Sequence, residues 1–422
     1  MELLKKIIVE NQDFIATRNL VNREVEIPSV DNIIIFTGIR RSGKTSLLYL
    51  EAKKHPIENV LFLDFEDERL LFLKTSFDYD VIIESYHEIY PDQKPILFLD
   101  EVQGLPNWHL YVKRLYAKGY KIFLSGSNAD LLSSDIATFI SGRGIEILVK
   151  PFSFREYLDF KKIDYSQKSR LTQKGVLKSA FNDYLQNGGF PEVIKANEKD
   201  KRIVIKTIYS LLFYKDLIAK NNRNEILMKL IIQKLHENLG KSFSLSNMAK
   251  KINPVHSTNR QTVADYYHLL HKPFLIHDIN QFRKSLLKRE GEKKAFFSDN
   301  SFIKHLSVST DYGKLLENQV FNALYNQDTD LFYYKTSNGF EVDFIYEKQS
   351  KPVLYQVSYD FSGEGTFHRE IKSLIKAMEE TETNTSFLIT IDHKETLETG
   401  GKQIRIVPCW EWLLDHDKDD FR

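Results

Sequence analysis

One short stretch constrains the fold of this chain more than any other. Residues 38–45 read Gly-Ile-Arg-Arg-Ser-Gly-Lys-Thr, which fits the pattern G-x-x-x-x-G-K-T. The apolar run 33–36 precedes this stretch, and the helical pattern 46–50 follows it. A strand, a glycine-bracketed loop and a helix in this order form a cradle for phosphate groups, because loop N–H groups and the positive end of the helix point to one place. The alternative interpretation is a glycine-containing turn before an ordinary helix.

The residues of this loop have separate expected roles in holding a nucleoside triphosphate. Gly38 and Gly43 allow the backbone to wrap closely around phosphate oxygens. Lys44 is expected to reach the β- and γ-phosphates, and the Thr45 hydroxyl to bind Mg²⁺. We therefore expect ATP and Mg²⁺ as cofactors. The expected binding residues are Gly38, Ile39, Arg40, Arg41, Ser42, Gly43, Lys44, Thr45 and Ser46.

A second apolar run, residues 95–99, ends in the acid pair Asp100 and Glu101. Such a run is typical of a central parallel strand, and open α/β sheets bind ligands at the carboxyl ends of their strands. Asp100 is expected to hold Mg²⁺ through water, and Glu101 to polarise the attacking water. The alternative is a strand that happens to end in two acids.

Two further residues are candidates for the chemistry. The strand expected over residues 121–128 ends in small polar residues, among them Ser127 and Asn128. A hydroxyl or amide there can sense the γ-phosphate, and we favour Asn128, although it could simply cap the next helix. Arg143 could supply positive charge to the transition state of its own or a neighbouring nucleotide, or be an ordinary surface arginine. The expected catalytic residues are therefore Glu101, Asn128 and Arg143.

Composition limits the class of protein. The chain has 422 residues, of which 42% are hydrophobic, so we expect two or three domains. The net charge of +1 is too small to attract the whole protein electrostatically to nucleic acid or to a membrane. Cys409 is the single cysteine, which excludes an intramolecular disulfide and a thiolate zinc cluster. No apolar run approaches a membrane span, and the first residues lack the apolar core of a signal peptide. We expect a soluble cytoplasmic protein with no membrane partner.

Residues 221–290 depart from this charge balance. They contain 12 Lys and Arg against 5 Asp and Glu, a local charge of +7. Two short helical patterns around a polar turn, followed by the apolar stretch 273–276, predict a winged helix-turn-helix. Asn259, Arg260 and Gln261 would begin its second helix and could contact DNA. The same fold could instead dock a protein client.

Several motifs taken together resemble a known family. They are the phosphate-loop motif, Leu-Phe-Leu-Asp-Glu, Ser-Gly-Ser-Asn, Ser-Gly-Arg, Pro-Phe-Ser-Phe-Arg-Glu-Tyr-Leu and Gly-Gly-Phe-Pro-Glu, in this order. The chain resembles prokaryotic AAA-type P-loop ATPases that carry a C-terminal domain of unknown function. This resemblance implies an α/β fold with an AAA-type parallel-sheet core (1–157), a helical and winged-helix middle (158–294), and a restriction-endonuclease-like α/β domain (295–422).

The tail domain keeps only part of the nuclease motif that the resemblance implies. Such domains usually carry Glu on the first helix, Glu-Val-Asp on one strand and Glu-Val-Lys on the next, which hold Mg²⁺ and activate water. Glu317, Glu341 and Asp343 match this pattern, but Gln356 and Ser358 stand at the third element. The lost carboxylate and lost lysine argue against hydrolysis and favour packing, DNA holding or partner docking.

The leading interpretation is Mg²⁺-dependent ATP binding and hydrolysis, with the cycle changing the relative positions of the three parts. One alternative is a nucleotide-dependent switch or binding module that turns over rarely. Another is an ATP-gated nuclease. The expected partners are ATP, together with DNA through residues 221–290 and the tail domain, or a protein client. A homo-oligomer, in which the partners are further copies of this chain, is also expected.

Overall fold

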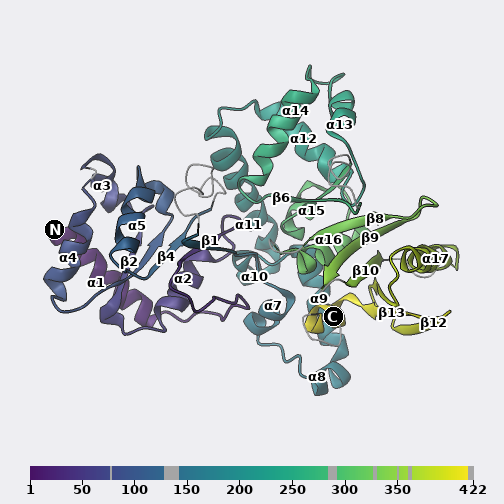
Figure 1. The fold of residues 1–422 in the computed structure, drawn as a ribbon, viewed down its shortest axis with the longest axis horizontal. Coiled ribbons are helices and arrows are strands. Elements are labelled where there is room, and N and C mark those ends of the chain that lie inside the picture. Colours follow the sequence, from purple (N-terminus) through teal and green to yellow (C-terminus); the bar gives the residue numbers. More distant parts are fainter. Residues whose placement is uncertain are drawn as a thin grey trace. The chain divides into compact units, whose positions relative to one another are not determined.

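The computed structural model of the chain describes residues 1–76, 78–127, 142–283, 292–326, 330–348, 351–359 and 364–416. It forms two compact units (Figure 1). The first contains Met1–Lys150 and Lys272–Phe274, and the second contains Pro151–His271 and Leu275–Arg422. In the part of the chain that is described, no helix has the length and apolar character needed to cross a bilayer.

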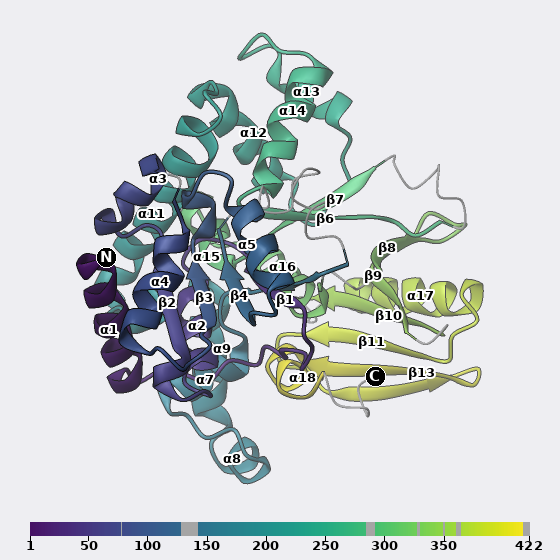
Figure 2. The ribbon, with the colours of Figure 1, turned by 60° about the vertical axis from the view of Figure 1, so that its left-hand side comes forward.

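The first unit is built around a parallel sheet, as the sequence predicts. Its strands are β1 (Ile33–Thr37), β2 (Val60–Asp64), β3 (Ile96–Asp100), β4 (Ile122–Ser125) and β5 (Gly144–Leu148), and their order is β2-β3-β4-β1-β5. Each strand runs parallel to its neighbours. The carboxyl ends of the strands therefore meet at one edge of the sheet (Figure 2).

Helices cover both faces of this sheet. They are α1 (Glu2–Thr17), α2 (Lys44–Ala52), α3 (Leu71–Ser76), α4 (Asp80–Ile89) and α5 (Trp108–Ala117). Within β1, Ile33 and Ile35 pack with α1, α4 and α5, whereas Ile34 and Phe36 pack with α2. Successive strand residues point to opposite faces, so an uninterrupted apolar strand such as β1 is buried on both sides.

The second unit begins with a group of helices. They are α7 (Phe154–Lys161), α8 (Gln167–Thr172), α9 (Lys174–Asn187), α10 (Pro191–Lys195) and α11 (Glu198–Leu211), which continues as a π-helix over Leu212–Ala219. The motif that begins at Pro151 has a local structural function. Ser153 Oγ accepts a hydrogen bond from the Glu156 N–H (3.1 Å), and Glu156 accepts one from the Ser153 N–H (2.8 Å). This capping box fixes the start of α7.

The middle of the chain forms a winged helix. Its elements are the helices α12 (Glu225–Glu237), α13 (Leu245–Ile252) and α14 (Arg260–His271), and the hairpin of β6 (Ile276–Gln281) and β7 (Lys293–Phe297). The three helices pack on one another (Figure 1). Phe243, between α12 and α13, makes a β-bridge to Lys293. The hairpin is therefore the wing, and α14 takes the place of the recognition helix.

The wing hairpin is also part of a larger mixed sheet. The further strands are β8 (Leu331–Lys335), β9 (Glu341–Lys348), β10 (Lys351–Ser358), β11 (Thr385–Thr390), β12 (Glu395–Thr399) and β13 (Lys402–Pro408). Their order is β12-β13-β11-β10-β9-β8-β6-β7. Because β6 pairs with β8, the winged helix and the tail share one sheet, and residues 294 and 295 both lie in β7.

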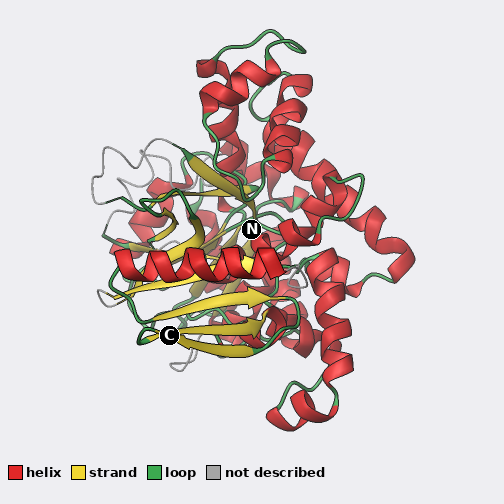
Figure 3. Cartoon of the chain, turned by 90° about the vertical axis from the view of Figure 1, so that its right-hand side faces the viewer, coloured by secondary structure: helices red, strands yellow, loops and turns green. Residues whose placement is uncertain are grey.

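Helices also cover the mixed sheet. They are α15 (Asn300–Leu306), α16 (Tyr312–Leu324), α17 (Glu364–Glu380) and α18 (Cys409–Asp415). The long helix α17 runs across strands β9, β10, β11 and β13 (Figure 3). Leu374, Ala377 and Met378 of this helix are fully buried against Leu354, Leu388 and their neighbours. The order of helix, strands, helix and strand in the tail agrees with the sequence expectation.

Candidate functional site

The loop between β1 and α2 has the backbone that a phosphate cradle requires. Gly38 has a φ of 135°, and a Cβ atom at this position would lie 2.3 Å from the Val149 carbonyl oxygen. Gly43 begins α2 with a φ of 100°. The first position excludes a side chain because another backbone approaches closely, and the second disfavours one because its positive φ would be strained for any other residue.

Lys44 lies inside this loop and is only 5% exposed. Its ammonium donates hydrogen bonds to the carbonyl oxygens of Gly38 (2.9 Å) and Ile39 (3.0 Å). The hydroxyl of Ser42 is also buried, and in the described part of the chain it has no hydrogen-bond partner. A buried donor without a partner is costly, so the loop contains polar groups that a phosphate oxygen could satisfy.

The structure brings Thr45 and Asp100 together at the carboxyl edge of the sheet. The Thr45 hydroxyl lies close enough to the carboxylate of Asp100 to lower the pKa of that carboxylate. Ser125, at the end of the intervening strand β4, donates a hydrogen bond to the same carboxylate. A hydroxyl and a carboxylate are hard oxygen ligands of the kind that Mg²⁺ takes, so these residues fit the metal expected beside a nucleotide.

Asp100 is 1% exposed, and this burial has an electrostatic consequence. Burial raises the pKa of Asp100 from 3.8 to about 6, although the hydroxyls of Ser125 and Thr45 act in the opposite direction. The folded protein therefore binds this proton more tightly than the unfolded chain does. As the pH rises from about 4 to above 6, the nucleotide-free protein loses stability through this group. A bound cation would offset that cost.

We expect Asp100→Asn to stabilise the nucleotide-free first unit by about 3 kcal/mol at pH 7.5, because the amide cannot ionise. The difference should shrink by roughly half at pH 5, where the natural side chain is largely protonated. Differential scanning calorimetry at the two pH values measures both quantities. Asp92→Asn, at an exposed site before β3, is the matched control. An Asn variant that is less stable at both pH values would contradict the assignment of a buried charge.

Glu101 follows β3 in the left-handed region, with φ 47° and ψ 44°. Its carboxylate accepts hydrogen bonds from the Ser127 hydroxyl (3.2 Å) and from the Gln103 amide. Its backbone N–H donates to Ser125 Oγ (3.3 Å). Non-glycine residues in this conformation are uncommon and cluster at functional sites, which supports the hypothesis that Glu101 acts on a ligand.

The other two expected catalytic residues are Asn128 and Arg143. Asn128 lies outside the described residues. Arg143 precedes β5, and its carbonyl oxygen accepts a hydrogen bond from the N–H of Ile33 (2.7 Å), the first residue of β1. The loop follows the other end of β1, and a five-residue strand spans roughly 16 Å. Arg143 therefore lies at the opposite edge of the sheet from the loop of its own chain.

Arg23 contacts the loop and was not expected from the sequence. It donates hydrogen bonds to the carbonyl oxygens of Ser42 (3.0 Å) and Lys150 (2.8 Å), and so connects the loop to the segment after β5. No sequence motif marks it, because 19 residues separate it from Ser42. Ser125 could have been found from its position at the end of a strand next to β3.

The acidic residues of the incomplete nuclease motif also come together, in the second unit. Glu317 on α16 and the β9 residues Glu341 and Asp343 all lie within 3.4 Å of the ammonium of Lys294 on β7. Lys294 is another residue that the sequence did not indicate. Burial by itself would lower the pKa of Lys294, but the three carboxylates raise it well above its ordinary value, so the side chain is charged.

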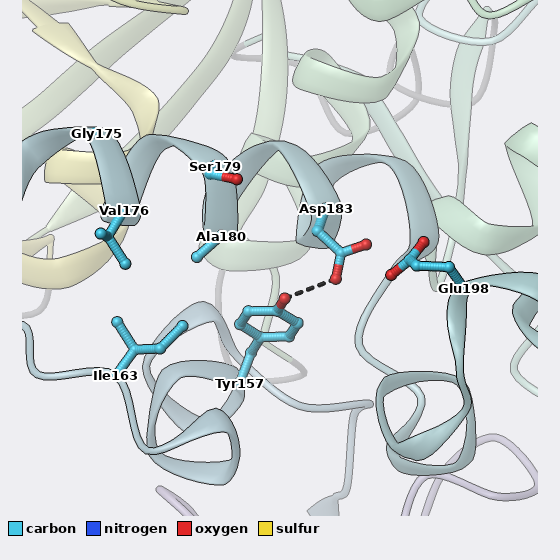
Figure 4. A pocket seen from close by; sticks show the side chains of 8 residues that line it. All are labelled: Tyr157, Ile163, Gly175, Val176, Ser179, Ala180, Asp183 and Glu198. Carbon is cyan, nitrogen blue, oxygen red and sulfur yellow. Dashed lines mark hydrogen bonds between the residues drawn. The ribbon is translucent and has the colours of Figure 1, made fainter.

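A shallow pocket on the second unit is lined by residues of α7, α9 and α11 (Figure 4). Tyr157 donates a hydrogen bond to Asp183 (2.6 Å), and Lys201 pairs with Asp183 and Glu198. Lys201 therefore neutralises the acidic groups of this pocket within the chain, and we assign the pocket no ligand.

Sequence comparisons divide the chain into three parts. Residues 30–158 match the family described as "AAA domain". Residues 178–312 match "Domain of unknown function (DUF8612)", and residues 312–412 match "Domain of unknown function (DUF4143)". A parallel sheet with a glycine-bracketed loop after β1 and an acid pair after β3 defines the class of the first unit. It is a P-loop nucleotide-binding unit of the AAA type.

The matches extend over whole proteins. An uncharacterized protein of Haemophilus influenzae is 30% identical over 95% of this chain and 98% of its own length. An uncharacterized protein of Methanocaldococcus jannaschii is 29% identical over 98% of this chain and 96% of its own length. The chain belongs to the family of these proteins, prokaryotic AAA-type P-loop ATPases with C-terminal domains of unknown function.

Among solved structures, AMPPCP-bound DnaA from Aquifex aeolicus is similar to this chain at 16% identity, over 63% of this chain and 84% of that chain. The TM-score of 0.29 is too low to support a functional argument.

Proposed function

We propose that this protein binds ATP together with Mg²⁺ and hydrolyses it. The observation that supports this proposal best is the closeness of the Thr45 hydroxyl to the Asp100 carboxylate, which brings the phosphate loop to the acidic end of β3. Lys44, the residue before Thr45, has its ammonium inside the same loop, on the carbonyl oxygen of Gly38. Positioned cations and oxygen ligands account for most of the catalysis of phosphoryl transfer, since the protein itself contributes little covalent chemistry.

Each residue has a specific role in this proposal. Backbone N–H groups of residues 38–46 and the ammonium of Lys44 bind the phosphates. Thr45 and Asp100 hold Mg²⁺, which supplies neutralisation of the phosphate charge when bound. Glu101 orients the attacking water and accepts its proton. Asn128 senses the γ-phosphate. Arg143 would act only on a nucleotide bound by another copy of the chain, because it lies at the far edge of its own sheet.

We further propose that the nucleotide cycle changes the relative positions of an ATPase part, a winged-helix part and a tail part. DNA is the partner that the winged helix favours. Arg260 and Gln261, at the start of α14, and the nearby Lys250 and Lys251 are exposed. Asn259 instead caps α14, since its side-chain oxygen accepts a hydrogen bond from the Thr262 N–H (2.9 Å). Basic groups around the start of a recognition helix are typical of phosphate and base contacts.

Steady-state release of phosphate from ATP, with and without duplex DNA, tests this function. We expect turnover that requires Mg²⁺, stops in EDTA and changes several-fold when DNA is added. Salt should weaken the effect of DNA, because Lys and Arg contacts to phosphates displace counterions. Tight ATP binding without measurable phosphate release would favour the alternative of a nucleotide-dependent switch. A rate that does not respond to DNA would favour a protein client.

A further inference from the structure

Lys294 is a fully buried lysine at the centre of three carboxylates. Its ammonium lies 2.8 Å from Glu341 Oε1, 3.3 Å from Asp343 Oδ1 and 3.4 Å from Glu317 Oε1. The ring of Tyr333 lies 5.5 Å from the same ammonium and adds a cation–π contact. The side chain of Lys294 is 0% exposed, whereas the carboxylates are 13–32% exposed. The ammonium therefore occupies the inner end of the cluster.

Gln356, at one of the two positions where the nuclease motif is lost, bonds to the neighbours of Lys294 rather than to its ammonium. Gln356 accepts a hydrogen bond from the Asp343 N–H (3.2 Å) and donates one to Glu370 (2.8 Å). The second oxygen of Asp343 accepts a hydrogen bond from the Val357 N–H (2.9 Å). These bonds hold Asp343 in one orientation, with its other oxygen on Lys294.

The winged helix covers the cluster as well as supplying its cation. Gly240, which follows α12, lies so close to Glu317 that a Cβ atom there would be 2.2 Å from the carboxylate oxygen Oε2. Lys294 comes from the wing strand β7, and the three carboxylates come from α16 and β9. Two segments of the winged helix therefore close on the acidic residues of the tail.

A divalent metal does not fit beside this lysine. Mg²⁺ binds carboxylate oxygens at about 2.0–2.1 Å and Ca²⁺ at about 2.3–2.6 Å, so either ion would occupy the space between the three carboxylates that the ammonium already fills. Two cations at this distance would also repel each other strongly. With Lys294 in place, no group of three or more His, Cys, Asp or Glu side chains among the described residues is arranged to hold a metal ion.

We propose that Lys294 replaces the metal ion of a nuclease-like site. Its ammonium places one positive charge among Glu317, Glu341 and Asp343 and locks the wing hairpin onto the tail strands. The tail then binds no divalent cation and cleaves no nucleic acid. The three carboxylates form a latent divalent-cation site, which opens when the Lys294 side chain is removed.

The test uses full-length protein without nucleotide, in an Asp100→Asn background that removes metal binding at the phosphate loop. Mn²⁺ binding is measured by electron paramagnetic resonance, and the melting temperature is measured with and without Mn²⁺. The variants are Lys294→Ala and Lys294→Ala with Asp343→Asn. Lys293→Ala is the matched control, because its ammonium lies on the same strand but pairs with Asp278 (3.1 Å).

In protein that retains Lys294, we expect Asp343→Asn to leave Mn²⁺ binding unchanged, because Asp343 binds no Mn²⁺ there. Lys294→Ala should melt about 5–10 °C lower, since the carboxylates of Glu317, Glu341 and Asp343 lose the ammonium that lies between them, and should bind one Mn²⁺ ion that restores at least half of this loss. Adding Asp343→Asn should abolish that binding. Lys293→Ala should gain no Mn²⁺. If Lys294→Ala fails to fold without metal, Lys294→Ala combined with Glu317→Gln, which removes one charge of each sign, should recover folding.

Three outcomes would overturn the proposal. One is an Mn²⁺ ion bound to the Lys294-containing protein and lost with Asp343→Asn. Another is a folded Lys294→Ala variant that binds no Mn²⁺. The third is metal-dependent nicking of plasmid DNA by the Lys294-containing protein that Lys294→Ala abolishes, because the lysine would then be a catalytic residue of an active nuclease.

Discussion

Lys44→Ala is expected to weaken ATP binding at least 100-fold. The ammonium of Lys44 is buried inside the loop, where it can exchange the carbonyl oxygens of Gly38 and Ile39 for phosphate oxygens. A hydrogen bond to a charged group contributes about 1.5–3 kcal/mol, so two such bonds to phosphates amount to roughly 3 kcal/mol or more, which is at least about 100-fold in affinity. Isothermal titration calorimetry with a non-hydrolysable ATP analogue and Mg²⁺ measures the change.

Lys53→Ala is the matched control for this experiment. Lys53 follows the same helix, is exposed, and also donates to backbone carbonyl oxygens, those of Ala16 and Arg18. It should bind the analogue as the natural protein does. Because Lys44→Ala also removes two bonds within the loop, a melting curve should accompany the titration. Unchanged affinity in a folded Lys44→Ala variant would remove the nucleotide site from the first unit.

Glu101→Gln is expected to reduce the turnover number about 100-fold or more, with the dissociation constant for Mg²⁺ and ATP changed less than threefold. Glutamine keeps the size of the side chain and can still accept a hydrogen bond from Ser127, but it loses the charge that orients water and accepts its proton. General base catalysis contributes about 10²–10⁴-fold, so its loss should appear in turnover rather than in binding. Phosphate release and calorimetry separate the two quantities.

Glu58→Gln removes the same charge from the first unit at an exposed site before β2, at the opposite end of the strands. It should leave turnover and affinity unchanged. If both the Glu101→Gln and the Glu58→Gln variants hydrolysed ATP at the natural rate, another residue of the site would activate the water. If Glu101→Gln lost nucleotide binding instead, Glu101 would be a binding residue.

The local elements could be predicted because their signals are short in sequence. The run 33–36 is apolar at every position, and the structure buries it on both faces as β1. The same reasoning predicted β3 and placed Asp100 at its carboxyl end. Thr45 and Asp100 could be paired in advance because parallel strands bring their carboxyl ends to one edge of a sheet. The roles of these residues in binding and hydrolysis stay predictions.

Other features could not be predicted, because they depend on contacts between distant segments. Arg23 reaches the loop across 19 residues, and Lys294 reaches Asp343 across 49. Nothing in the sequence around Lys294 indicates that its ammonium will lie between carboxylates of α16 and β9. The sequence shows that Gln356 and Ser358 interrupt a motif, but not which group neutralises the carboxylates that remain.

The sequence by itself determined the class of the first unit, because the chemistry of phosphate binding requires particular residues at fixed spacings within eight positions. The sequence also determined that the tail keeps three acidic residues of the nuclease motif, Glu317, Glu341 and Asp343. The tertiary structure alone decided that Arg143 lies at the far edge of its own sheet, and that β6 and β7 join the tail strands in one sheet. The physical reason is that pairing of strands and burial of charge are properties of segments brought together by folding, which no single segment specifies.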